Sequence, residues 1–160
     1  MNFYQSLGYL VFGSRLKRLG EAFINDVNRI YKMHNIGFDA SWFPVFYILS
    51  RKNEISIREV SDELGVSHSA ASQLLSSLQQ KGFIKTSVSK KDARKKVVLF
   101  TAKGEKLLAK IKPVWSALEK AMIELASEGT GSKQILTALS EIESNLQSAS
   151  LLARVASHLS

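Results

Sequence analysis

Residues 55–80, ISIREVSDELGVSHSAASQLLSSLQQ, have the pattern of two short amphipathic helices separated by one glycine. Ser56 can cap the first helix, and Glu59, three residues later, can accept a hydrogen bond from the Ser56 amide. This helix is expected to end at Gly65, because glycine tolerates the left-handed conformation that a sharp turn between helices requires. The stretch therefore predicts a helix, a tight turn and a second helix that begins near Ser67.

The second predicted helix has one apolar and one polar face. Its apolar positions recur at helical spacing and are expected to point into the core: Ala70, Ala71, Leu74, Leu75 and Leu78. The other positions carry short polar side chains, which can approach base edges closely in the DNA major groove: Ser67, His68, Ser69, Ser72, Gln73 and Ser76. Any two amphipathic helices joined by glycine share this pattern, so the motif alone does not establish DNA binding.

A β-hairpin is predicted directly after the two helices. Residues 83–88 and 96–100 are β-branched or aromatic runs, and they flank a short charged tip. Nine basic and two acidic residues lie between Lys81 and Lys106, so this window carries +7 of the formal net charge of +8. A merely solvated surface normally mixes the two signs of charge. The local excess of positive charge favours a polyphosphate partner such as DNA.

Residues 53–104 resemble the winged helix-turn-helix of the MarR family of bacterial and archaeal transcriptional regulators. The resemblance rests on the helix-turn-helix around Gly65 and on two motifs of the hairpin, or wing. The first motif is Asp92-Ala93-Arg94 at the tip of the wing. The second is Phe100-Thr101-Ala102-Lys103-Gly104, where the wing passes into the next helix. The family pattern is Asp-x-Arg followed by Leu-Thr-x-x-Gly, and phenylalanine stands here in place of the leucine.

The resemblance implies where this chain would contact DNA. Residues 67–76 would lie in the major groove and Arg94 in the minor groove, while Asp92 would help to orient the arginine. The candidate DNA-binding residues are therefore Ser67, His68, Ser69, Ser72, Gln73, Ser76, Lys90, Lys91, Asp92, Arg94 and Lys95. Recognition helices of the family often carry a base-reading arginine, and this one has none. The wing and the phosphate contacts are then expected to supply more of the affinity.

Long apolar helices are predicted at both ends of the chain. Residues 3–31 carry two apolar stripes, more than one neighbouring helix can cover, and residues 101–125 and 132–159 also follow helical spacing. Dimerisation through these end helices is one interpretation, and folding of the first helix back on its own domain is the other. The predicted fold is mainly α, a single MarR-like domain over 1–160. Its winged helix-turn-helix core spans 38–104, and its dimerisation helices span 1–34 and 105–160.

Aromatic residues gather where the first long helix meets the predicted DNA-binding core: Tyr31, Phe38 and Trp42, with His34 nearby. By the resemblance, this region would hold a small aromatic effector. Ordinary core packing is the alternative that we favour, because clusters of aromatic side chains are usually part of a core.

Several classes of function are excluded by what the sequence lacks. It has no cysteine, which excludes disulfides, cysteine-based zinc sites and thiol redox sensing. It has no phosphate-binding glycine loop and no hydrolase or zinc-protease motif, and its three histidines are far apart. We therefore predict no enzyme activity, no metal and no cofactor. No apolar run could span a membrane, and the Leu7 to Phe12 stretch is too short for a signal peptide, so a cytoplasmic location is expected.

Taken together, these patterns predict a homodimeric transcriptional regulator of double-stranded DNA. It is expected to bind a pseudo-palindromic site and to act as a repressor that a ligand relieves. One alternative is a winged-helix dimer that binds nucleic acid without sequence preference, or binds a protein partner. A second is a small enzyme with an unrecognised site, for which the sequence offers no convergent set of titratable residues.

Overall fold

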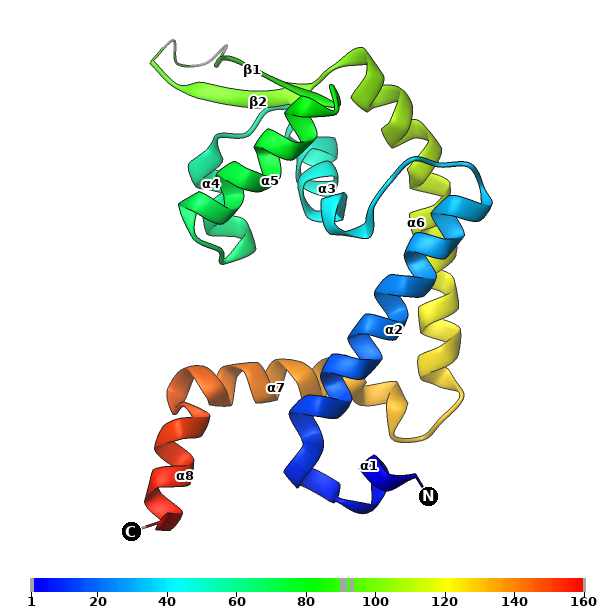
Figure 1. Cartoon of the computed structure of the whole chain (residues 1–160), viewed down its shortest axis with the longest axis vertical. Helices are drawn as coiled ribbons and strands as arrows, with labels where there is room; N and C mark the ends of the chain where they lie inside the picture. Colours follow the sequence, from blue (N-terminus) through cyan, green and yellow to red (C-terminus); the bar gives the residue numbers. More distant parts are fainter. Residues whose placement is uncertain (1, 90–91, 93, 160) are drawn as a thin grey trace. The chain divides into compact units, whose positions relative to one another are not determined.

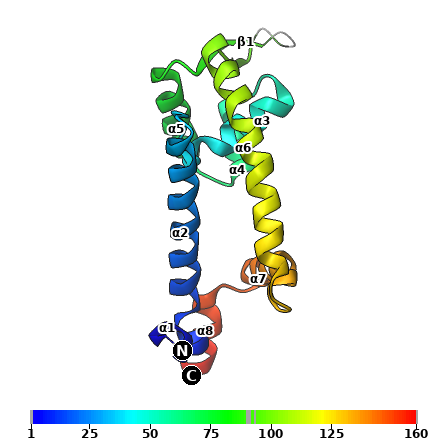
Figure 2. The ribbon, with the colours of Figure 1, turned by 90° about the vertical axis from the view of Figure 1, so that its right-hand side faces the viewer.

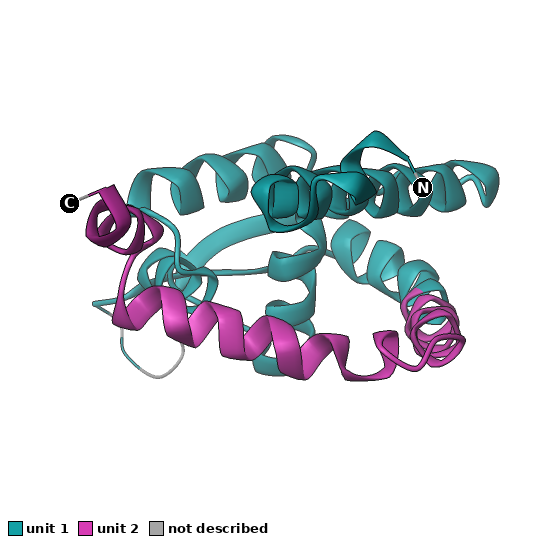
Figure 3. Cartoon of the chain, turned by 90° about the horizontal axis from the view of Figure 1, so that it is seen from below, with its two compact units in different colours: residues 1–114 teal, residues 115–160 magenta. Residues whose placement is uncertain are grey.

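The structure, a computed structural model, describes residues 2–89, 92 and 94–159, so Lys90 and Lys91 of the predicted wing tip lie outside the described residues. The chain divides into two compact units, residues 1–114 and residues 115–160 (Figure 3). The long helix α6 (Ala102–Ser127) contributes to both units. The division of a single domain into a core and dimerisation helices stays a prediction.

The first unit holds the winged helix-turn-helix. Helices α4 and α5 pack against each other, α5 also contacts the hairpin, and α3 is drawn to the right of α5 in Figure 1. The elements of this core are α3 (Phe43–Lys52), α4 (Ile57–Leu64), α5 (His68–Gln80), β1 (Ile84–Val88) and β2 (Lys96–Phe100). A short 3-10 turn, η2 (Ala40–Trp42), precedes α3. The predicted helix-turn-helix and wing are confirmed.

The hairpin is antiparallel and gains a third backbone partner. Ile84 pairs with Phe100 at the base of the hairpin, and Val88 pairs with Lys96 near its tip. Ile55, in the loop before α4, exchanges two backbone hydrogen bonds with Val98, at N–O distances of 3.0 and 2.8 Å. The loop between α3 and α4 therefore attaches the wing to the helix-turn-helix.

Local interactions explain why α4 starts and ends where it does. The Ser56 hydroxyl accepts a hydrogen bond from the Glu59 amide (3.2 Å), and the Glu59 carboxylate accepts one from the Ser56 amide (2.8 Å). Gly65 ends the helix with φ 61° and ψ 30°, a left-handed conformation that costs glycine little. The Ser61 hydroxyl donates to the Val66 carbonyl (2.7 Å) and closes the turn. The predicted capping box and glycine turn are both confirmed.

Helix α5 begins at its predicted cap, where the Ser67 hydroxyl accepts a hydrogen bond from the Ala70 amide (3.2 Å). Ala71, Leu75 and Leu78 are buried, as predicted. The prediction that Ala70 points into the core is wrong, because its side chain is exposed. Successive residues of a helix are about 100° apart, so Ala70 lies well to one side of the stripe that starts at Ala71.

The core of the first unit is rich in aromatic rings. Phe46 is fully buried, and its ring lies 4.9 Å from those of Phe38 and Phe100 and 6.0 Å from that of Phe83, measured between centroids. These residues come from the chain before α3, from α3 itself and from both sides of the hairpin. Packing of their rings therefore joins the hairpin to the helical part of the core.

The first predicted helix is interrupted near its start. The structure has α1 (Phe3–Ser6), the 3-10 turn η1 (Gly8–Val11) and then the uninterrupted helix α2 (Phe12–Met33). Figure 2 shows α2 from the side. A single helix over residues 3–31 is therefore wrong. Gly8 has φ 56°, a conformation outside a right-handed helix that glycine adopts readily.

The last predicted helix is also interrupted. The second unit contains the end of α6, η3 (Ser132–Gln134), α7 (Ile135–Ser148) and α8 (Leu151–Leu159). Ala149 is extended, with φ −151° and ψ 119°. The Arg154 guanidinium donates to the carbonyls of Asn145 (2.8 Å) and Ala149 (3.0 Å) at the break. The Asn145 carbonyl also accepts the last helical hydrogen bond of α7, from the Ala149 amide (3.1 Å). A single helix from Ser132 to Leu159 is therefore wrong, and the rotated apolar stripe after Leu146 marks the break.

Replacing Ser56 by alanine should lower the free energy of unfolding by about 1 kcal/mol near neutral pH, as loss of a helix cap does. Hydrogen bonds from the Ser56 hydroxyl and amide lower the pKa of Glu59 below its ordinary value of 4.5. The stabilisation of the folded protein by the charged Glu59 carboxylate is therefore fully present above pH 4.5, the ordinary pKa. It is lost as the pH falls through the lower pKa that Glu59 has in the folded protein. Urea unfolding of the wild type and S56A should accordingly differ less at about pH 3 than at about pH 7.

The control for this comparison is Ser76→Ala. Ser76 is exposed inside α5, and its substitution should change the free energy of unfolding by less than about 0.5 kcal/mol at either pH. A difference between wild type and S56A that did not change with pH would show that the Glu59 carboxylate adds nothing to the cap.

Candidate nucleic-acid interface

The predicted DNA-facing residues of α5 share one surface. Ser69, Ser72, Gln73 and Ser76 stand at helical spacing, and all but the half-buried Ser72 are exposed. His68 is also exposed, in the first turn. The Ser67 hydroxyl is engaged as the helix cap. The helix therefore presents a row of small hydroxyl and amide groups, none of them charged.

The tip of the wing is built around Asp92. Its carboxylate accepts a hydrogen bond from the backbone amide of Arg94 (3.0 Å), and its carbonyl accepts one from the amide of Lys95 (3.0 Å). The Ser89 amide in turn donates to the Lys95 carbonyl (2.9 Å), which closes the hairpin. Asp92 thus fixes the backbone that carries Arg94, and the side chain of Arg94 is exposed.

The basic side chains of the wing stay outside the ion pairs of the described residues. The described basic side chains of this region are all exposed: Lys81, Lys85, Arg94, Lys95, Lys96, Lys103 and Lys106. None of them forms an ion pair with another described residue, whereas four ion pairs occur elsewhere in the described chain. Unpaired cations on one surface create a positive potential that attracts phosphates.

Two of these lysines have partners of another kind. The Lys81 ammonium lies 5.2 Å from the centre of the Trp42 ring, and the Lys103 ammonium lies 4.8 Å from that of Phe83. Lys103 also donates to the Lys81 carbonyl (2.7 Å). These contacts hold the two lysines at the base of the wing. Among the described residues, the cations left to meet a ligand near the tip are therefore Arg94, Lys95 and Lys96.

The junction between the wing and α6 explains the motif from Phe100 to Gly104. The Thr101 hydroxyl donates to the Gly82 carbonyl (2.6 Å) and accepts from the Gly104 amide (3.1 Å). Gly104 is buried against the Phe83 carbonyl, and a β-carbon built there would lie only 2.0 Å from that oxygen. The motif therefore fixes where the hairpin ends and where α6 starts.

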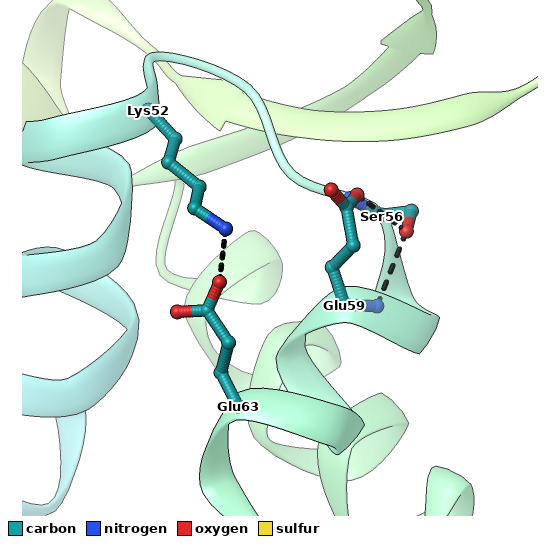
Figure 4. A network of polar contacts seen from close by, with 4 residues as sticks. All are labelled: Lys52, Ser56, Glu59 and Glu63. Carbon is teal, nitrogen blue, oxygen red and sulfur yellow. Dashed lines mark hydrogen bonds and ion pairs between the residues drawn. The ribbon is translucent and has the colours of Figure 1, made fainter.

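A polar network that the sequence did not reveal supports the helix-turn-helix. Lys52, at the end of α3, forms an ion pair with Glu63 of α4, next to the capping pair of Ser56 and Glu59 (Figure 4). The hydrogen bond with Glu63 raises the pKa of Lys52 above its usual value, so this lysine stays charged near neutral pH. A hollow of about 410 Å³ beside this network is lined by residues of the wing as well.

The aromatic candidates for an effector site contact one another. Tyr31 lies 5.0 Å from Phe38, and Phe38 lies 5.7 Å from Trp42, between ring centroids. Tyr31 and Phe38 are buried, Trp42 is half-buried, and the side chain of His34 is exposed. The structure thus brings three of the four predicted residues together as packed rings, which supports our preference for core packing.

Metal sites and membrane spans are both absent from the part of the chain that the structure describes. Residues 2–89, 92 and 94–159 hold no group of three or more His, Cys, Asp or Glu side chains that could bind a metal ion. Over the same residues, every helix is too short or too polar to cross a membrane.

Comparison with known proteins gives consistent matches. Residues 36–95 match the model of the MarR family. The HTH-type transcriptional regulator BilQ of Clostridioides difficile is 28% identical over 113 residues, which cover 71% of this chain and 72% of BilQ. These matches are to transcriptional regulators and not to enzymes, in agreement with the prediction that the chain is not an enzyme.

Solved structures of low sequence identity share the fold. The Staphylococcus aureus MepR–DNA complex matches with a TM-score of 0.69 at 16% identity, covering 84% of this chain and 97% of MepR. A MarR/EmrR regulator from Acinetobacter sp. ADP1 matches with a TM-score of 0.68 at 18% identity, covering 92% and 99%. The repressor CouR, bound to a 23-mer duplex, gives 0.68 at 23% identity, covering 86% and 96%. Residues 36–95 of the chain thus resemble the MarR family, and the chain has the winged helix-turn-helix fold of these solved regulators.

Proposed function

We propose that this protein is a cytoplasmic, homodimeric repressor that binds a pseudo-palindromic site in double-stranded DNA. The proposal rests on one observation: α5 has a polar face of hydroxyl, amide and imidazole groups, and the basic side chains described on the adjacent wing form no ion pair with described residues. The face formed by His68, Ser69, Ser72, Gln73 and Ser76 would contact base edges in the major groove. Arg94 would enter the minor groove, and Lys90, Lys91 and Lys95 would contact phosphates.

Exposed apolar side chains support the homodimer. Helices α1, α7 and α8 contain no buried residue among those described. The exposed fractions of Leu10, Leu136 and Leu152 are 86%, 76% and 80%. Such residues at both ends of a chain favour burial against a second copy, because large apolar patches are rare on monomers. Two-fold symmetry would then place the recognition helices about 34 Å apart, one turn of DNA.

Relatives of known structure add support for DNA as the partner. The structures of MepR and CouR named above are complexes with DNA, and so is an operator complex of Escherichia coli MarR that shares this fold.

A ligand that separated α2 from the core near Trp42 would change the spacing of the two recognition helices. The dimer would then no longer match the groove repeat, and it would bind fewer phosphates.

The proposal is tested by selecting bound sequences from a random duplex library at near-physiological salt. An enriched inverted repeat, with half-sites about one helical turn apart, is the expected result. Low salt is avoided because it rewards charge without sequence. Binding that fades as salt rises, with no sequence enriched, would refute sequence-specific recognition.

The second candidate is a winged-helix dimer that binds nucleic acid without sequence preference. It is favoured by one observation, the absence of arginine from the exposed face of α5. Alanine at Ser69, Ser72 and Gln73 distinguishes the two. Under our proposal these substitutions relax the selected sequence, at about 1–3 kcal/mol for each base that is no longer hydrogen-bonded. Under the second candidate they leave the selection unchanged.

A further inference from the structure

One side-chain hydrogen bond joins the wing to the loop that leads into the helix-turn-helix. The Ser89 hydroxyl, just after β1, donates to a carboxylate oxygen of Glu54 over 2.8 Å. Ser89 is only 9% exposed, and the two residues are 35 positions apart in the sequence. Bonds from a hydroxyl to a charged acceptor are stronger than neutral ones, particularly away from bulk water. Glu54 therefore holds the wing at the point where its tip begins.

Backbone hydrogen bonds connect this contact to Arg94. The Ser89 amide bonds the Lys95 carbonyl, the Lys95 amide bonds the Asp92 carbonyl, and the Asp92 carboxylate bonds the Arg94 amide, over 2.9, 3.0 and 3.0 Å. The turn that carries Arg94 is thus closed on Ser89. A displacement of Ser89 would therefore also shift Lys95, Asp92 and Arg94, because each bond in the series involves a backbone group.

The loop between α3 and α4 has a second contact with the wing, which does not involve Ser89. Ile55, the residue after Glu54, pairs with Val98 of β2 through two backbone hydrogen bonds. This pairing holds the base of the wing, whereas the bond between Glu54 and Ser89 acts at the start of the tip. Loss of the Ser89 bond should therefore leave the hairpin paired but allow its tip to change direction.

We propose that Glu54 and Ser89 form a wing latch that positions Arg94 against the DNA. The inference rests on the proposed function, in which Arg94 enters the minor groove. Glu54 is a positioning residue that touches no DNA, and its carboxylate would otherwise disfavour binding through repulsion of phosphates. The latch therefore predicts that removing this negative charge weakens DNA binding, the opposite of what net charge predicts.

The first test is Ser89→Ala, which removes the hydroxyl and leaves every charge in place. The affinity for the selected duplex should fall about tenfold, the effect expected from one charge-assisted hydrogen bond. In an Arg94→Ala background the same substitution should have almost no effect, since the side chain that the latch positions is gone. A purely structural role would lower the urea midpoint and leave the affinity of the folded protein unchanged.

The second test is Glu54→Gln, which keeps the shape of the side chain and removes its charge. It should weaken binding by about threefold, because the acceptor becomes a neutral amide. The matched control is Asp62→Asn, an equal change of charge at an exposed carboxylate of α4 that forms an ion pair with Arg58. D62N should leave the affinity unchanged or raise it. If S89A does not fold, the comparison of E54Q with D62N still tests whether Glu54 positions the wing.

Two results would overturn the latch. One is a loss of affinity from S89A that is equally large in the wild-type and R94A backgrounds, and the other is a gain of affinity in E54Q. Failure of the proposed function is recognised separately, because wild-type protein would then select no sequence. The same variants can in that case be measured on a random-sequence duplex, where the dependence on Arg94 still supports or refutes the latch.

Discussion

Replacing Gly104 by alanine is expected to lower the free energy of unfolding by about 3 kcal/mol, the upper end of the cost of overpacking. The added β-carbon would lie 2.0 Å from the Phe83 carbonyl oxygen and 2.8 Å from the Phe100 ring. The carbonyl is backbone that also accepts hydrogen bonds from the Thr101 amide (3.0 Å) and hydroxyl (3.2 Å), so it cannot move without cost. Urea unfolding at a fixed protein concentration measures the change.

The control is Gly13→Ala. Gly13 is exposed in α2, and a β-carbon there meets no atom within 4 Å. Alanine should therefore stabilise the protein by about 0.5–1 kcal/mol, because glycine weakens a helix. Equal stability of G104A and wild type would show that α6 does not approach the hairpin as closely as the structure indicates.

Replacing Arg94 by alanine is expected to weaken binding to the selected duplex by about tenfold to hundredfold, the range for removal of one specific side chain from the interface. The side chain is exposed at the tip, while its backbone amide is held by Asp92. The logarithm of affinity should also depend less steeply on salt, with a slope reduced by about one. Fluorescence anisotropy titrations at several salt concentrations measure both quantities.

Two variants separate the position of Arg94 from its charge. Lys110→Ala removes one exposed positive charge from α6, away from the wing, and should weaken binding far less. Arg94→Lys keeps the charge and loses the planar guanidinium, so it should recover only part of the affinity. An equal loss in K110A and R94A would show that the tip contributes charge alone.

The elements that sequence predicted well are those fixed by interactions between residues close in the chain. The cap formed by Ser56 and Glu59 needs residues three apart, and the turn at Gly65 needs one residue of the right kind. The two strands of the wing are neighbours joined by a short tip. Patterns of this length are visible in a single sequence.

The two helix breaks and the contact between Glu54 and Ser89 were not predicted, for different physical reasons. Gly8 takes a backbone conformation that leaves the apolar spacing around it intact, so periodicity continues across that break. At Ala149 the apolar stripe rotates, but apolar residues continue at helical spacing on either side of the break. The contact between Glu54 and Ser89 joins residues 35 apart that follow no spacing rule. Only the fold brings such residues together, which is why part of the candidate site could not be predicted.

Strand β1 has a second role that follows from its place in the sheet. Within the described residues it pairs with β2 on one side and has no strand on the other. An open edge of this kind is a template for strands of other molecules, and hence for aggregation. β1 is only five residues long, and the exposed Lys85 lies next to its first residue. The same positive charge that suits the hairpin to DNA therefore also discourages edge-to-edge association of the unbound protein.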